Sequence, residues 1–121
     1  MLTKSIAVAV LTCALTVAAI AGPLEEANSA IGRRDFATAA RVVRPLAERG
    51  DSNAQYMLGM FYGNGVGVPQ DRVKAYMWLS LAASQGRENA ATIRDLTARL
   101  MTAKQIEEGR QLAAQWTAVS K

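Results

Sequence analysis

The feature that most constrains this chain is an internal repeat at an offset of 36 residues. At this offset, residues that start helices coincide with one another, and so do residues that end helices and small residues. The coinciding pairs are Asp35 with Asp71, Ala39 with Ala75, Ala47 with Ala83, Gly50 with Gly86, Asn53 with Asn89 and Ala54 with Ala90. A period in the mid-thirties is typical of two-helix repeats, which bury their faces by stacking on one another. The repeat therefore predicts a solenoid.

Apolar residues recur at helical spacing through most of the chain, and no segment alternates as a half-buried strand would. Aspartates suited to cap helices stand at positions 35, 51 and 71. The expected helices are 24–34, with Gly32 as a possible end, then 36–49, 52–64, 72–85, 88–100 and a last one opened by Thr102 and Gln105. Pro45 is expected to kink or loosen its helix. The fold class is thus all-α, a short α-solenoid of about six helices.

Residues 1–21 have the pattern of a signal peptide. Lys4 precedes an uncharged and largely apolar run, and Ala19-Ile20-Ala21 supplies small residues for cleavage after Ala21. Cleavage would leave one domain, residues 22–121, in the periplasm or outside the cell. The alternative is an uncleaved segment that anchors the protein to the inner membrane.

The best-formed unit resembles a known family. Its residues Ala54, Leu58-Gly59, Tyr62, Gly65-Val66, Asp71, Lys74-Ala75, Trp78, Ala82-Ala83, Gly86 and Ala90 are similar to the Sel-one-like repeat, a relative of the tetratricopeptide repeat. The resemblance implies a right-handed α-helical solenoid that acts as an adaptor for other proteins, and some bacterial members are exported. Residues 54–90 match best, and 34–50 resemble the first helix of a preceding unit. Residues 91–118 are expected to be degenerate or capping helices.

The side chains that most often carry out catalysis or bind metals are scarce. The sequence has no histidine, and its single cysteine, Cys13, lies in the expected leader. The Gly63–Gly67 stretch lacks the Gly-Lys-Ser/Thr ending of a phosphate loop and follows a helix, so it predicts a turn. We therefore expect no catalytic residue, no cofactor and no metal, and a protein that is not an enzyme.

Basic residues are concentrated early in the mature chain, and Arg41 and Arg44 share one helical face. The net charge of +4 is small, and aromatic residues are not interleaved with the basic ones, so nucleic acid is not expected as a partner. Trp78 and Trp116 each complete an apolar stripe and are expected in the core rather than in a groove. An acidic partner or a solvated basic face both fit the arginines.

The expected function is an exported interaction or adaptor module that binds another protein or peptide of the cell envelope. Membrane contact is expected only through an uncleaved leader. Taking the repeats' first helices to line the concave face, we expect partner-binding residues at Arg44, Tyr76 and Ser80. Two alternatives stay open: a cell-envelope hydrolase or cell-wall-associated enzyme of the repeat family, and a structural component that self-associates.

Overall fold

The computed structural model describes residues 22–120, so the expected signal peptide lies outside the described residues. Six helices and no strand are present in this part of the protein. They are α2 (Pro23–Gly32), α3 (Phe36–Glu48), α4 (Ser52–Asn64), α5 (Arg72–Ser84), α6 (Ala90–Ala98) and α7 (Ala103–Ser120). No helix among these described residues is long and apolar enough to cross a membrane.

The helix starts are set by local hydrogen bonds from side chains. Asp35, Asp51 and Asp71 each accept a hydrogen bond from the backbone amide three residues later, at 3.3, 2.9 and 3.0 Å. Each bond satisfies an amide that has no partner inside its helix. Thr102 and Gln105 form the reciprocal pair of a capping box at the start of α7. The capping expected from the sequence is thus confirmed at all four sites.

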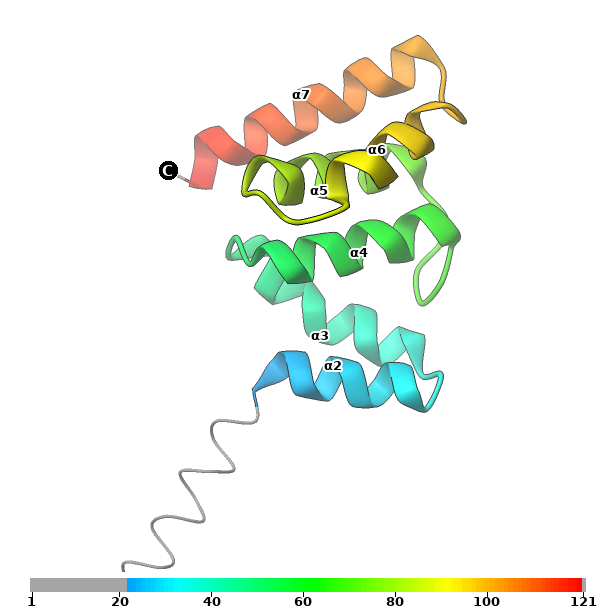
Figure 1. Cartoon of the computed structure of the whole chain (residues 1–121), viewed down its shortest axis with the longest axis vertical. Helices are drawn as coiled ribbons and strands as arrows, with labels where there is room; N and C mark the ends of the chain where they lie inside the picture. The colour runs from blue at the N-terminus through cyan, green and yellow to red at the C-terminus, as the bar shows by residue number, and fades with distance from the viewer. Residues whose placement is uncertain (1–21, 121) are drawn as a thin grey trace, which may run out of the picture.

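The helices form one stack. Each of the helices α2 to α5 packs against the next in the sequence, and α7 packs back on α5. Figure 1 shows α2 at one end of the molecule's long axis and α7 at the other. This is the all-α helical repeat solenoid that the 36-residue offset predicts.

Small residues allow the helices to approach closely. Eight alanines are fully buried: Ala27, Ala30, Ala39, Ala47, Ala54, Ala75, Ala82 and Ala90. Several are the pairs that coincide in the sequence repeat, which explains why those positions recur. Gly59 of α4 lies against Leu79 of α5, as expected for a glycine placed where a neighbouring helix comes close.

The connector between α4 and α5 has a defined shape. Gly65 and Gly67 have positive φ angles of 65° and 75°, which glycine adopts readily. Val66 and Val68 pack against the core, as expected from their apolar character. The Gln70 side-chain amide donates to the Gly63 carbonyl at 3.0 Å and fastens the connector to the end of α4.

One helix, α6, differs from the expected pattern. It is shorter than expected, because it begins at Ala90, after Asn89 with φ of 67°, and ends at Ala98. Two large apolar residues of the expected helix 88–100 are exposed, Leu96 by 48% and Leu100 by 67%. By contrast, α3 continues through Pro45 to Glu48.

Candidate functional site

The three residues expected to bind a partner lie on helices α3 and α5 but do not form one open surface. Arg44 is exposed on α3, and Ser80 on α5 is half-buried. Tyr76 on α5 is only 7% exposed. Helix α7 covers its ring at Gly109, where a Cβ atom would lie 2.8 Å from Tyr76 Cδ1. A groove centred on Tyr76 is therefore closed by the last helix.

Arg110 provides further evidence that α7 is docked on Tyr76. A hydrogen bond with the Tyr76 side chain raises the pKa of the Arg110 guanidinium above its usual value. Gly109 and Arg110 therefore meet the same aromatic residue from α7, one through close backbone approach and the other through its side chain. Tyr76 helps to attach the last helix.

Arg44 has a different partner from those expected. Its Nη2 atom donates a hydrogen bond of 2.9 Å to the hydroxyl of Tyr62 on α4. On the same ring, the Lys74 ammonium lies 5.3 Å from the ring centroid, within cation–π range. The sequence analysis named Tyr62 and Lys74 among the residues of the family resemblance but left both out of the candidate site. The 36-residue offset gave no signal for this cluster, because its three members occupy unrelated repeat positions.

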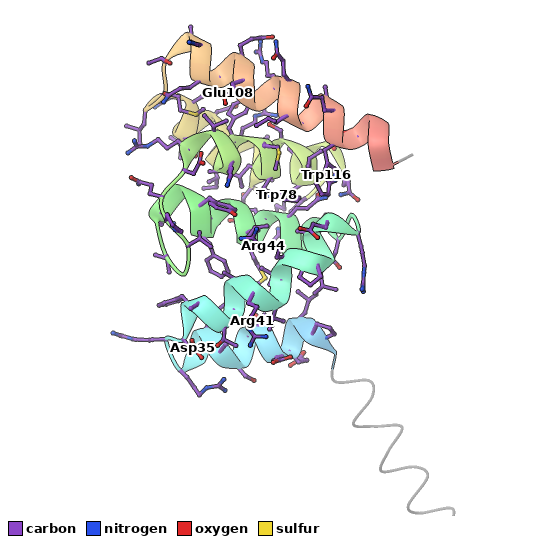
Figure 2. The ribbon with its side chains drawn as sticks, turned by 180° about the vertical axis from the view of Figure 1, so that it is seen from behind. Asp35, Arg41, Arg44, Trp78, Glu108 and Trp116 are labelled. Atoms are coloured by element: carbon purple, nitrogen blue, oxygen red, sulfur yellow. The ribbon has the colours of Figure 1, made fainter. Side chains whose placement is uncertain are left out.

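The two tryptophans join α5 to α7. Trp78 and Trp116 have ring centroids 5.0 Å apart and an interplanar angle of 65°, the edge-to-face arrangement that aromatic pairs favour. Figure 2 labels the two residues close to one another. Trp78 is buried in the core, as expected, whereas Trp116 is only partly buried and packs against the core from outside.

A hollow of about 240 Å³ lies between α4 and α6, and its wall is largely apolar. Its most buried lining residues are Gly59 and Leu79, and Met60 adds further apolar wall from α4. Leu96 and Leu100 line it from the α6 side. We call this hollow the α4–α6 groove. Ile93, Thr97, Gly63, Asn64 and Arg72 complete its lining.

Among residues 22–120, no group of three or more His, Cys, Asp or Glu side chains is placed to hold a metal ion. The capping aspartates Asp35, Asp51 and Asp71 are separated along the stack, each at the start of its own helix. Two other features stand out on the surface, the α4–α6 groove and the Arg44–Tyr62–Lys74 cluster.

Comparison with known proteins agrees with this architecture. Residues 52–86 match the model of the Sel1 repeat. This matched segment begins with α4 and includes α5. A search of the curated proteins finds no match. The solved structures include a similar protein, a protective antigen present in uropathogenic Escherichia coli strains that displays an SLR fold. The antigen and this chain are 34% identical in sequence, and the match covers 69% of this chain. The TM-score of the two structures is 0.64.

The present chain spans only 18% of the length of that antigen. Within the matched repeat, α4 is the first helix and α5 the second. The 36-residue offset aligns α3 with α5, so α3 corresponds to a second helix. Since α2 packs on α3 as α4 packs on α5, we infer that α3 is the second helix of its pair, rather than the first as expected from the sequence. The protein thus carries a Sel1 repeat at residues 52–86, within an all-α helical repeat solenoid.

Proposed function

We propose that this protein is a non-catalytic interaction module that binds a segment of another protein in the α4–α6 groove. The observation that carries the proposal is the exposure of Leu96 and Leu100, by 48% and 67%, beside the matched repeat. Large apolar side chains exposed together along one hollow are a feature of interaction sites. The Sel1 repeat supports the same class of function, since helical solenoids present extended surfaces to partners.

The size of the groove favours a protein ligand over a small molecule. Pockets for small ligands usually measure ~300–1,000 Å³, and this groove measures about 240 Å³. That volume accommodates one or two apolar side chains projecting from a partner segment. Arg72 also lines the groove, so an acidic residue next to those apolar side chains would meet a complementary charge.

The strength of such binding can be bounded. Complete burial of a leucine side chain contributes ~1.5–3 kcal/mol, and Leu96 and Leu100 are each only partly exposed to begin with. Two leucines alone would therefore give weak binding, and further contacts on the partner must supply the rest. We expect a transient partner rather than a permanent subunit.

We also propose that the module acts in the cell envelope after export. The support is the leader pattern of residues 1–21, with its positive start, apolar run and small residues before Gly22. Mass spectrometry of the mature protein from the expressing cells tests this directly. A polypeptide that begins at Gly22 agrees with cleavage after Ala21, whereas an intact leader in the membrane fraction would favour the anchor.

The binding proposal is tested with exposed-residue variants. Purified Leu96→Ser/Leu100→Ser protein should recover the partner from an envelope extract several-fold less well than the unchanged protein. Ala91→Ser is the matched control, because Ala91 is exposed on the same helix and does not line the groove. Equal recovery by the double variant, with helical circular dichroism retained, would rule out the groove. Turnover of peptidoglycan by the purified protein would contradict the non-catalytic assignment.

A further inference from the structure

A second hollow, of about 250 Å³, lies beside the connector between α4 and α5. Two cationic side chains, Arg44 from α3 and Lys74 from α5, line it together with Tyr62. Val68 and Asp71 form other parts of its wall. It shares no lining residue with the α4–α6 groove.

The two cations have no anionic partner within the described part of the protein. In residues 22–117 the ion pairs are Arg94 with Asp95 and Arg110 with Glu107. Asp71 is the carboxylate that lines the hollow, and its Oδ1 atom accepts the Lys74 backbone amide at 3.0 Å as a helix cap. Positive charge therefore outnumbers negative charge in this hollow.

The arginine is held in position although it is exposed. Tyr62 is 5% exposed, and its hydroxyl accepts a hydrogen bond of 2.9 Å from Arg44 Nη2. A guanidinium has five N–H donors, so this bond leaves the others for a ligand. Fixing the guanidinium in advance lowers the entropy lost when it binds a carboxylate. Figure 2 shows Arg44 on the face of the stack seen from behind.

The wall of the hollow is also fixed. Gly67 lies against the carbonyl of Phe36 at the start of α3, so the connector packs directly onto α3. The Tyr62 carbonyl accepts a hydrogen bond of 2.9 Å from the Asp71 amide, which joins α4 to the start of α5. The cations on α3 and α5 thus face a cavity whose sides do not depend on a ligand for their shape.

We propose that this hollow binds the carboxylate of an acidic residue on a partner segment. Arg44 and Lys74 supply the charge and the hydrogen-bond donors, and Tyr62 is a positioning residue that orients Arg44. The volume of about 250 Å³ suits one acidic side group. The proposal goes beyond the apolar groove and does not rest on it.

The test is a titration of the uniformly ¹⁵N-labelled protein, followed by NMR, with the α-amide of N-acetylglutamate. The γ-carboxylate is the only charged group of this probe. We expect saturable shifts of the Tyr62, Val68 and Lys74 backbone amides, with half-saturation in the millimolar range. The α-amide of N-acetylglutamine, which has the same shape without the charge, should give no saturable shift.

Variants identify the residues responsible. Arg44→Gln and Lys74→Gln should each weaken binding about tenfold, as expected for loss of a charged donor. Tyr62→Phe should also weaken it, because Arg44 loses the hydroxyl that orients it, while the amide spectrum keeps the dispersion of the folded protein. Lys104→Gln, which removes an exposed cation from α7, should bind as the unchanged protein does.

Several results would overturn the proposal. Equal shifts with the glutamine amide would remove the role of the carboxylate, and unchanged affinity in both charge variants would remove the site. Tighter binding of N-acetylglycine would assign the hollow to the carboxyl terminus of a polypeptide, and tighter binding of inorganic phosphate would assign it to a phosphoryl group. Because no partner protein enters this titration, its failure leaves the α4–α6 groove to be judged by its own experiment.

Discussion

Gly59 of α4 lies directly against Leu79 of α5, where a Cβ atom would be 2.8 Å from Leu79 Cγ. Leu79 is 1% exposed, and its backbone nitrogen would also lie 3.3 Å from that Cβ atom, so a shift of the side chain alone does not relieve the contact. Alanine raises helix propensity by ~1 kcal/mol over glycine, but overpacking costs ~1–3 kcal/mol. We therefore expect Gly59→Ala to lower the free energy of unfolding by up to about 2 kcal/mol, measured by urea denaturation.

Gly63 provides the matched control on the same helix. A Cβ atom there would lie 3.6 Å from the Ala75 Cβ, an ordinary van der Waals distance. Gly63→Ala should leave the free energy of unfolding unchanged or raise it by up to about 1 kcal/mol. A Gly59→Ala variant as stable as Gly63→Ala would show that α4 and α5 are not packed as described.

A second pair of glycines allows the cost of backbone strain to be distinguished from the cost of a steric collision. Gly67 and Gly86 have similar positive φ angles, 75° and 79°. A side chain at Gly86 meets nothing within 4 Å, whereas one at Gly67 would collide with the Phe36 carbonyl. Gly86→Ala should cost about 1–2 kcal/mol of stability from strain alone, and Gly67→Ala clearly more. Equal melting temperatures for the two variants would contradict the fixed connector.

The cap at Asp35 gives a prediction for acid pH. Hydrogen bonds from the Thr38 side chain and then its backbone amide hold the pKa of Asp35 below its ordinary value of 3.8. A lowered folded-state pKa means that the ionised cap stabilises the protein above pH 3.8 and that this contribution is lost as the pH falls through the lowered value. The stability difference between the unchanged protein and Asp35→Asn should therefore narrow below pH 3.8, as seen in melting curves. A difference that stays constant down to about pH 2 would contradict this role.

The tryptophan pair predicts coupling between α5 and α7. Trp78 and Trp116 meet edge to face with centroids 5.0 Å apart, an interaction worth ~0.5–1.5 kcal/mol beyond area burial. A double-mutant cycle with Trp78→Leu and Trp116→Leu should give a coupling energy of that size from denaturation curves. Additive effects would show that the two rings act independently.

Features set by neighbouring residues were predictable from the sequence. The capping aspartates and the glycine turns depend on local backbone geometry, so Asp35, Asp51, Asp71 and Gly65 could be placed without knowledge of the tertiary packing. The repeat offset then indicated stacking, because small residues recurred where helices touch.

Features set by distant segments could not be predicted in this way. The stripe of α6 is apolar, but periodicity does not tell whether a neighbour covers it, and Leu96 and Leu100 are exposed. Tyr76 looked available because its repeat position suggested a surface, yet α7 covers it through Gly109. The last helix departs from the repeat pattern, so its docking position could not be inferred from the offset.

The central claim is that the α4–α6 groove receives a partner, and site-specific photocrosslinking in the expressing cells tests it most directly. A photoreactive amino acid at Leu96 or Leu100 should yield the same single crosslinked protein, and one at Ala91 should yield none, because Ala91 does not line the groove. Mass spectrometry should map the crosslink to an apolar segment of that protein. Crosslinks that are as abundant at Ala91 as at Leu96, or absent at both leucines, would contradict the claim.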